Sequence, residues 1–358
     1  HRYTVDNSWH IPHFEKMLYD NAQLLSVYSN GYKVFKEDRF LKELHNIYNF
    51  LDSKMTGDNG LIFSSISADT NYSDGTKSEG DFYVWKADEL KNILKKDFDW
   101  VSEYYNINQK GYWEKDTYVF YQTVSDAEFA SKLGISLAEF EKKLSKVNLS
   151  IRKEREKRVH PIIDNKIIFS WNALTIRGLV DSYKITKDQK FLTKALVINN
   201  SLVKNMISKN IIQHTNSSFS SVLFLEDYSY YIDALIGLYE VTFDQKFLNF
   251  ADQLTVFTNE KFKESNGFYR FSTNQQTLFA DSLIDLADGV TPSANSVMNF
   301  NLFRLGHYYG NKEYLLQSKE MINNISDNLN DRVTDHLLWL NNSHNYSQKF
   351  YELAVSGK

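Results

Sequence analysis

The sequence predicts an all-α protein built from repeated helical hairpins, and three observations support this. Prolines and glycines are few, 3 and 14 of 358 residues, which favours helices over a turn-rich β architecture. One phrase recurs that ends a helix, turns at Asp or Asn and starts the next helix. Its aromatic residues Phe191, Phe247 and Tyr314 are spaced by 56 and 67 residues, the length of a hairpin plus a return loop. Repetition at this period indicates a helical array, either an open solenoid or a closed toroid.

Four copies of this phrase predict four αα-hairpins. In each copy we expect the turn residue to cap the second helix and the aromatic residue three positions later to pack back on the first helix. The copies are Gly31–Leu41, Ser182–Leu192, Leu238–Leu248 and the looser His307–Leu315.

An insertion separates the first copy from the second. Gly60–Ser64 and Gly80–Trp85 have the composition of short strands, and a polar segment around Asp74 and Gly75 lies between them. We therefore expect a β-hairpin within an insertion at 57–125 of a single domain that spans 1–358. Further helices are expected at 86–95, 126–133 and 136–157.

The composition excludes several classes of protein. The net charge is -4 and no basic block is longer than Arg152–Arg158, which argues against a nucleic-acid partner. There are no cysteines, so disulfides and thiolate zinc sites are excluded. The sequence contains no apolar run of about 18 residues, so it predicts no membrane span. The opening residues lack the apolar segment of a signal peptide, so we expect a cytoplasmic protein.

Common cofactor and metal motifs are also missing from the sequence. There is no G-x-G-x-x-G, Walker loop or G-x-S-x-G. His10 and His13 have no later partner at the spacing of a metal site. We therefore expect neither a cofactor nor a metal.

The opening stretch, from His1 to Ala22, combines three histidines, an arginine and several carboxylates and aromatic residues. Pro12 and the apolar spacing after it predict a helix that starts near His13. Glu15 would then stand in the first turn, where the helix dipole favours a carboxylate. The alternative is that Glu15 only caps the helix and that the histidines are packing groups.

Similar polar and aromatic clusters begin the first helix of each hairpin. Stacked in register, they would line a funnel with aromatic faces, amides and carboxylates, which suit a polyol. The alternative is ordinary capping by Ser170, Asp227 and Ser293. Capping explains less easily why Glu226 stands beside Asp227. The clusters are 12–16, 168–172, 224–229 and 291–296.

Long motifs in order along the chain resemble the spermatogenesis-associated protein 20 family. They read HRYTVD, PHFEKMLYDNAQL, EGDFYVW, DNKIIFSWNAL, FLEDYSYYIDALIGLYE and TPSANSV. The resemblance implies a thioredoxin-like domain followed by a toroid similar to N-acylglucosamine 2-epimerases and six-hairpin glycosidases. It therefore implies an (α/α)6 toroid that is incomplete at both ends of this chain, and a thioredoxin-like domain that lies outside it.

The resemblance also bears on the chemistry. The similar epimerases use a pair of histidines on inner helices, whereas the helices that begin near Ser170, Asp227 and Ser293 contain none at their starts. This difference favours a pair of carboxylates, which suits either hydrolysis or proton transfer between aldose and ketose.

We therefore expect a carbohydrate-binding or carbohydrate-processing toroid, similar to sugar epimerases, isomerases or glycosidases, with its site at the N-termini of the inner helices. Asp227 and Glu15 are the candidate acid and base. The alternative is a non-catalytic helical scaffold that accompanies a thioredoxin-like redox domain. The expected partners are a small carbohydrate and that domain, with no nucleic acid and no membrane. The candidate sugar-binding residues are Arg2, His13, Trp171, Asn172, Tyr228 and Asn295.

Overall fold

The computed structural model describes residues 2–217, 221–273, 283–326, 329, 332–349 and 351. These residues form two compact units. The helical unit comprises residues 18–64 and 165–358, and the small unit comprises 1–17 and 65–164. Each unit is described by itself.

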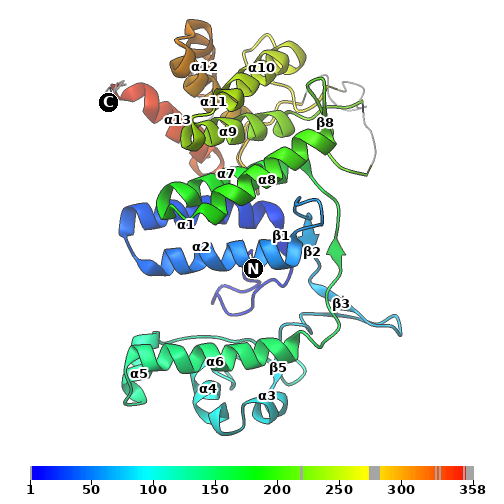
Figure 1. Cartoon of the computed structure of the whole chain (residues 1–358), viewed down its shortest axis with the longest axis vertical. Coiled ribbons are helices and arrows are strands. Elements are labelled where there is room, and N and C mark those ends of the chain that lie inside the picture. Colours follow the sequence, from blue (N-terminus) through cyan, green and yellow to red (C-terminus); the bar gives the residue numbers. More distant parts are fainter. Residues whose placement is uncertain are drawn as a thin grey trace. The chain divides into compact units, whose positions relative to one another are not determined.

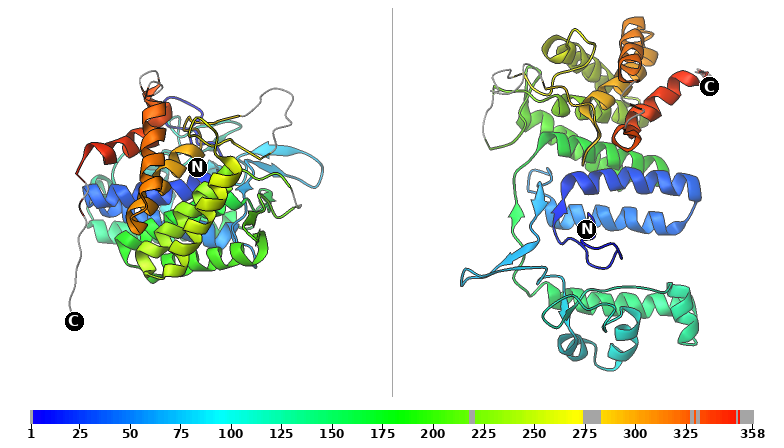
Figure 2. Two further views of the ribbon diagram at one scale, coloured as in Figure 1. Left: turned by 90° about the horizontal axis from the view of Figure 1, so that it is seen from above. Right: turned by 180° about the vertical axis from the view of Figure 1, so that it is seen from behind.

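The helical unit consists of hairpins that follow one another in chain order (Figure 1; Figure 2, right). Within the described residues there are four hairpins and one further helix, α13. Short strands β8 (Ile207–Ser208) and β9 (Ile211–Ile212) lie in the return loop after α8, and a π-helical turn at Leu51–Met55 extends α2. The hairpins are α1 (Leu18–Phe35) with α2 (Asp38–Phe50), α7 (Phe169–Thr186) with α8 (Gln189–Met206), α9 (Leu225–Thr242) with α10 (Gln245–Phe262), and α11 (Ala294–Tyr309) with α12 (Lys312–Ile325); α13 is Leu337–Ser347 and follows a 3-10 turn at Val333–His336.

The first helix of each hairpin is an inner helix. Helix α1 packs on α7, α7 on α9 and α9 on α11, so each inner helix contacts that of the next hairpin, and α11 packs on α13. Buried residues surround α7, α9 and α11 on all sides, whereas those of α8, α10 and α12 form a stripe. A helix that is buried on all sides belongs to the centre of a fold, and an amphipathic helix covers it. The alternation of inner and outer helices is the arrangement that the repeat predicts.

The structure confirms the predicted hairpin turns, with one difference. The first helix of all four hairpins is followed by a left-handed residue, namely Lys36, Lys187, Phe243 and Gly310. In the last three hairpins the next side chain, Asp188, Asp244 or Asn311, accepts a hydrogen bond from a backbone N–H of the outer helix. In the first hairpin the N-cap is Glu37, whose side chain makes no capping bond, and Asp38 lies inside α2.

The predicted helix start near His13 is wrong. Residues 13–15 are not helical, Lys16–Met17 form strand β1, and α1 begins at Leu18. The N–H of His13 donates to the carbonyl of Tyr3, and Thr4 bridges Pro12. These backbone groups are used in antiparallel pairing, so Glu15 does not stand in a helical first turn.

The small unit contains paired short strands and helices, and it corrects the predicted strands. The hairpin strands lie inside the polar segment, with a turn at Gly75, and only the end of Gly80–Trp85 is a strand. Gly60–Ser64 contains one bridge, from Ile62 to Thr56. The predicted helices are confirmed and α4 is additional. The elements are the sheet β1–β2 (Ser65–Ile66)–β7 (Ile163–Asp164), the pairs β3 (Asp69–Asn71)–β4 (Lys77–Glu79) and β5 (Trp85–Lys86)–β6 (Thr117–Tyr118), and helices α3 (Ala87–Leu94), α4 (Phe98–Tyr104), α5 (Asp126–Lys132) and α6 (Leu137–Arg155), with a 3-10 turn at Lys95–Asp97.

The chain enters the small unit between the first and second hairpins. The segment 65–164 of this unit overlaps the expected insertion at 57–125 but has different bounds, and residues 1–17 belong to the same unit. That the whole chain forms one domain stays a prediction. In the part of the chain that the structure describes, every helix is too short or too polar to cross a bilayer.

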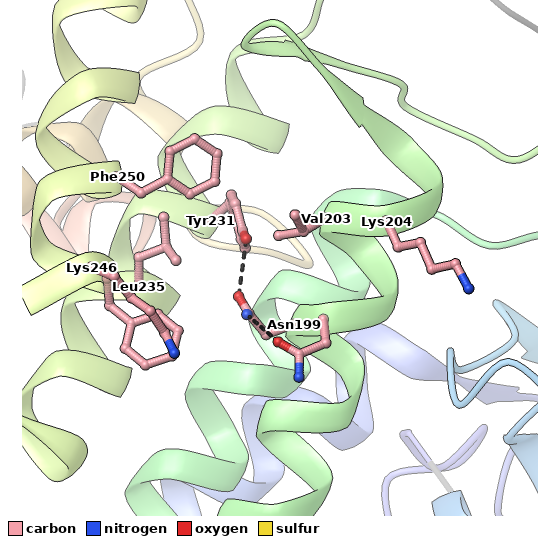
Figure 3. Close-up of a pocket in the computed structure, with 9 residues that line it drawn as sticks. Asn199, Val203, Lys204, Tyr231, Leu235, Lys246 and Phe250 are labelled. Atoms are coloured by element: carbon pink, nitrogen blue, oxygen red, sulfur yellow. Dashed lines mark hydrogen bonds between the residues drawn. The ribbon is translucent and has the colours of Figure 1, made fainter. Parts of the chain in front are cut away.

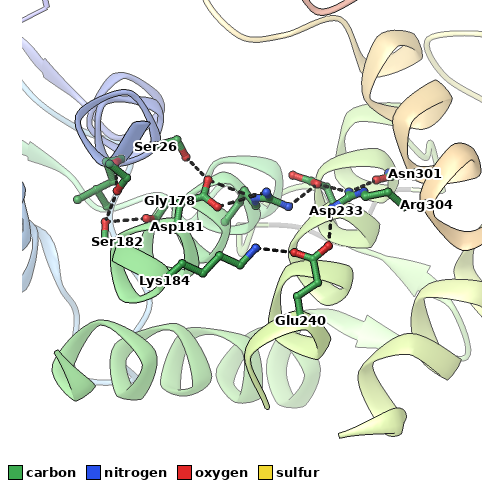
Figure 4. A network of polar contacts seen from close by, with 12 residues as sticks. Ser26, Gly178, Asp181, Ser182, Lys184, Asp233, Glu240, Asn301 and Arg304 are labelled. Carbon is green, nitrogen blue, oxygen red and sulfur yellow. Dashed lines mark hydrogen bonds and ion pairs between the residues drawn. The ribbon is translucent and has the colours of Figure 1, made fainter. Parts of the chain in front are cut away.

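Charged residues link neighbouring inner helices of the helical unit in register (Figure 4). Arg177 of α7 and Asp233 of α9 are 56 positions apart, like Phe191 and Phe247, and they form an ion pair of 3.1 Å. Lys184 and Glu240 have the same offset and pair at 2.5 Å. Arg304 of α11 contacts both Asp233 and Glu240. The spacing of the repeat therefore places equivalent residues of adjacent inner helices side by side.

The three cations also determine the ionisation of Glu240. Burial alone would raise the pKa of Glu240, but the charges of Arg304, Lys184 and Arg177 outweigh burial and lower the pKa to about 2. The folded state therefore holds Glu240 as a carboxylate throughout the neutral range.

The close packing of α1 on α7 predicts a strong effect of Gly178→Ala. A Cβ at Gly178 would lie 2.4 Å from the carbonyl oxygen of Ala22, whereas a Cβ at Gly237 would meet nothing closer than 3.4 Å. Both replacements gain helix propensity, so Gly237→Ala is a matched control. We expect Gly178→Ala to lower the free energy of unfolding by about 1–3 kcal/mol, and Gly237→Ala to leave it unchanged or raise it. Urea unfolding measures both, and equal effects would contradict the predicted clash.

The charge network predicts a pH-dependent contribution of Glu240 to stability. Its folded pKa is about 2 and its ordinary value is 4.5, so the folded state binds fewer protons between these values. The stabilisation is therefore complete above pH 4.5 and is lost as the pH falls toward 2. We expect Glu240→Gln to lower the free energy of unfolding by up to about 3 kcal/mol at neutral pH and by less in acid. Urea unfolding across this range tests it against Glu260→Gln, an exposed control; a Glu240→Gln effect independent of pH would contradict it.

Candidate functional site

Near the start of each of three inner helices, one side chain is hydrogen-bonded to the backbone of the return loop that precedes the helix. Asn172 accepts a hydrogen bond from the N–H of Ile62 and donates to its carbonyl, at 2.9 Å each. Asn295 does the same with Tyr269, at 2.8 and 2.9 Å. The hydroxyl of Tyr228 accepts from the N–H of Ile212 and donates to the carbonyl of Asn210. The offsets of 56 and 67 residues make these three positions equivalent in the repeat.

These contacts use the polar groups of three residues predicted to bind sugar. The amide of Asn172 donates also to Ile168, and that of Asn295 donates also to Asp285. All three side chains are at most 1% exposed. Their role as sugar-binding residues stays a prediction that this geometry does not favour.

A segment after α8 brings His214 to the N-terminal end of α7. The carbonyl of His214 accepts from the N–H of Phe169, the first residue of α7, and Thr215 bridges Ile168. In the next return loop, the carbonyl of Phe271 accepts from the N–H of Leu225, the first residue of α9. His214 and Phe271 thus occupy corresponding positions, each beside the start of an inner helix.

His214 meets a pair of acidic residues at the start of α9. Its Nδ1 lies 3.0 Å from Oδ2 of Asp227 and 3.8 Å from Oε1 of Glu226. Ser170 joins the cluster: its backbone N–H donates to Asp227 over 3.1 Å and its hydroxyl donates to Glu226 over 3.0 Å. The side chain of Asp227 is 1% exposed, whereas those of His214 and Glu226 are 29% and 23% exposed. Asp227 therefore orients the imidazole from within the protein.

The pKa of each of the three groups is raised, but the causes differ. Burial lowers the pKa of His214, but the hydrogen bond and charge of Asp227 outweigh it and raise the pKa above its ordinary value. Burial, followed by the charge of Asp227, raises the pKa of Glu226. Burial raises the pKa of Asp227, although His214 opposes this. All three groups therefore retain their protons to a higher pH than they would in water, and perturbed pKa values of this kind are common in acid–base sites.

Helix capping explains only one of the three proposed caps. Ser293 is the N-cap of α11 and its side chain accepts from the N–H of Ser296. The N-caps of α7 and α9 are Ile168 and Phe224, so neither Ser170 nor Asp227 is a cap. Their contacts with His214 and Glu226 need a different explanation from capping.

A cavity of about 200 Å³ opens beside this cluster, at the N-terminal ends of α9 and α11. Glu226 belongs to its lining and is thus shared between the cavity and the histidine. The cavity is smaller than the pockets of drug-sized ligands. Its lining comprises Leu225, Glu226, Tyr230, Phe271, Asp285, Ala287, Gly289, Val290, Thr291, Pro292, Ala294 and Asn295.

The remaining predicted site residues lie in both units. In the helical unit, Trp171 is half-buried and packs edge-on against Tyr19, with ring centroids 4.7 Å apart. In the small unit, Arg2 forms an ion pair of 2.9 Å with Glu15. His13 stacks on Tyr3, with ring centroids 4.6 Å apart. Glu15 and Asp227 belong to different units, and their pairing as acid and base stays a prediction.

The cluster also has the composition of a metal site. His214, Glu226 and Asp227 offer ligand atoms within 4.8 Å of one another, and among the described residues no other group of three is found. An imidazole and two carboxylates are ligands that Zn²⁺ and related ions accept. The sequence predicts no metal, because the spacing from His214 to Glu226 follows no known metal-binding motif.

A second cavity, of about 380 Å³, lies between α8, α9 and α10. Aromatic and aliphatic side chains dominate its lining, and Figure 3 shows Lys204 extending away from the rings of Tyr231 and Phe250. The hydroxyl of Tyr231 donates to Asn199 over 2.9 Å. The lining contains no carboxylate and no histidine, so this cavity lacks acid–base groups.

Sequence reasoning missed His214 and chose Asp227 over Glu226 as the reacting group. A catalytic histidine was expected only on the inner helices, and His214 lies in a return loop. His214 and Phe271 follow an outer helix by a similar distance. This equivalence in the repeat was the one signal that could have placed His214 beside the start of an inner helix. Nothing in the sequence shows that Asp227 points inward while Glu226 faces a cavity.

Solved structures share this fold. A sugar epimerase from a ruminal bacterium aligns over 91% of this chain and 64% of its own, with a TM-score of 0.54 and 12% identity. Cellobiose 2-epimerase from Spirochaeta thermophila aligns over 92% and 63%, with a TM-score of 0.51 and 11% identity. The protein is therefore an all-α protein of the (α/α)6 toroid class, as predicted.

Sequence comparison identifies the family. An uncharacterized protein of Caenorhabditis elegans, B0495.5, is 30% identical over 92% of this chain and 49% of its own length. Spermatogenesis-associated protein 20 from Rattus norvegicus is 28% identical, over 88% of this chain and 44% of its own. The chain belongs to the spermatogenesis-associated protein 20 family, and it spans about half the length of these relatives. No family model matches the chain.

The contact between His214 and Asp227 predicts how substitutions of its neighbours change the pKa of the His214 imidazole. Because the carboxylate of Asp227 raises the pKa of His214, we expect Asp227→Asn to lower it. Glu226→Gln should lower it less, since Glu226 lies farther from Nδ1. NMR titration of the imidazole with EDTA present measures both. An unchanged pKa of His214 in Asp227→Asn would show that the two groups do not interact in solution.

Proposed function

We propose that the helical unit binds a small carbohydrate at the N-terminal ends of its inner helices and performs acid–base chemistry on it. The observation that carries the proposal is Glu226, which lines the cavity and lies beside the buried His214–Asp227 pair. The named relatives of the fold are sugar epimerases, which supports a carbohydrate as the ligand. Fold alone does not define a reaction, so the proposal depends on the cluster.

Each member of the cluster has a distinct role in this proposal. Glu226 transfers the proton to or from the sugar, because it faces the cavity and its raised pKa allows it to be protonated. His214 stabilises the ionised form of Glu226 through its charge, since its Nδ1 lies 3.8 Å from the carboxyl oxygen of Glu226 and is hydrogen-bonded to Asp227. Asp227, predicted as the acid or base, instead positions His214, since it is too buried to touch a ligand.

Proton transfer at carbon, as in epimerisation or isomerisation, is the reaction we favour. A base removes the proton next to the carbonyl carbon of the open-chain sugar, and an acid returns one to the other face or the neighbouring carbon. Hydrolysis needs two carboxyl groups on opposite sides of a glycosidic bond. The burial of Asp227 prevents it from serving as the second group for Glu226. The predicted catalytic role of Glu15 and the predicted sugar-binding roles of Arg2, His13 and Trp171 stay predictions.

Proton exchange in deuterated water tests this reaction. We expect ¹H NMR to show exchange of the C2 proton of a monosaccharide that also raises the melting temperature of the chain. Glu226→Gln and His214→Gln should each slow the exchange by about 10²–10⁴-fold. Glu260→Gln, an exposed change on the outer helix α10, is the matched control and should leave it unchanged.

Two rival outcomes would redirect the proposal. New reducing ends from a disaccharide, without exchange of the C2 proton, would indicate hydrolysis. Neither exchange, nor hydrolysis, nor a thermal shift with any sugar would favour a non-catalytic scaffold that accompanies a thioredoxin-like domain in the longer protein.

A further inference from the structure

The cavity at the start of α9 and α11 is lined by ionisable side chains of one sign. Glu226 and Asp285 are its two charged lining residues, and no lysine or arginine belongs to the lining. Tyr230 donates its hydroxyl to the carbonyl of Pro292, so this group is already used. A ligand in the cavity meets carboxyl groups without a neighbouring cation from the lining.

The return loop between α10 and α11 is acidic as well. Residues 263–293 contain two basic residues, Lys263 and Arg270, and four carboxylates, one of which, Asp281, lies outside the described residues. Arg270 forms an ion pair of 2.7 Å with Glu264 and is therefore compensated. Asp288 accepts hydrogen bonds from the backbone N–H groups of Ser293 and Leu338.

Asp285 differs from the other carboxylates of this loop. Its backbone carbonyl accepts hydrogen bonds from Ser293 and Asn295. Among the described contacts its side chain makes no hydrogen bond or ion pair, although it lines the cavity. The side chain is thus available to a ligand, while the backbone contacts would survive its replacement.

Charges of one sign that share a cavity repel each other, and no cation of the lining compensates Glu226 and Asp285. His214 does not belong to the lining and is hydrogen-bonded to Asp227. A further negative charge in the cavity would meet this repulsion, whereas a positive charge would relieve it.

Resting on the proposed function, we infer that the cavity selects sugars by charge, taking amino sugars and neutral sugars and rejecting acidic ones, with Asp285 as a specificity-determining residue. The amino sugar's ammonium group would be held by Asp285 and Glu226. Uronic acids and sugar phosphates would be repelled by the same two side chains.

Calorimetric titration of the full 358-residue chain, with EDTA present to keep metal ions off the His214 cluster, tests this inference. Glucuronate and glucuronamide differ in charge at one position and are nearly equal in shape. We expect glucuronate to bind at least about tenfold more weakly than glucuronamide, a ratio that corresponds to one short-range repulsion between partly screened charges. Glucosamine should bind more tightly than glucose.

The variant Asp285→Asn separates this inference from the proposed function. The ratio of the affinities for glucuronamide and glucuronate, and that for glucosamine and glucose, should both shrink in Asp285→Asn. Both ratios should remain in the control Glu260→Gln. Added salt should reduce both ratios in the original chain, because it screens charges. Sugars that bind without regard to charge, or ratios that Asp285→Asn leaves intact, would overturn charge selection while leaving a carbohydrate site in place. No binding by any of the four sugars would overturn both proposals.

Discussion

Hydrogen bonds between the return loops and the starts of the inner helices determine the structure at the N-terminal ends of the inner helices. Asn172, Tyr228 and Asn295 each hold the backbone of a loop from inside the protein. Buried backbone groups of a loop need such partners, because they have left water and belong to no regular helix or sheet. The loops then carry His214 and Phe271 to defined places beside the start of the inner helix of the hairpin that each loop follows. Without these contacts the loops could not support a site of fixed geometry.

The repeat distinguishes residues that build the fold from residues that build the site. Positions 172, 228 and 295 perform the same task in three hairpins, and the pairs Arg177–Asp233 and Lys184–Glu240 join equivalent positions. By contrast, of the equivalent positions 170, 226 and 293, two carry a serine and only Glu226 carries a carboxyl group. This carboxyl group belongs to the cavity lining. A departure from the repeat at a buried helix start costs stability unless it is compensated, and Ser170 and His214 supply that compensation.

Charge is distributed unevenly along the inner helices. Toward their C-terminal halves, Arg177, Lys184 and Arg304 balance three carboxylates. At the start of α9, the charges of Asp227 and Asp285 raise the pKa of Glu226, while the charge of His214 and the hydrogen bond from Ser170 lower it. The balanced region stabilises the packing of neighbouring hairpins, while the unbalanced region retains groups whose protonation can change. Active sites commonly hold such uncompensated groups, because reactivity requires a pKa near the working pH.

The sequence by itself determined the repeated hairpins and the end of the hairpins where polar residues gather. These features follow from local spacing and turn chemistry, which act over a few neighbouring residues and are therefore visible in one chain. The repeat alone left an open solenoid or a closed toroid, and only the resemblance of the motifs to a known family implied the (α/α)6 toroid class. Tertiary structure decided that α1 starts at Leu18, because pairing with distant segments uses the backbone groups that a longer helix would need. It also decided that Asp227 points inward, that Glu226 lines a cavity and that His214 joins them from a loop. Such facts depend on contacts between residues far apart in the chain, and no local pattern encodes which side chain of an adjacent pair is buried.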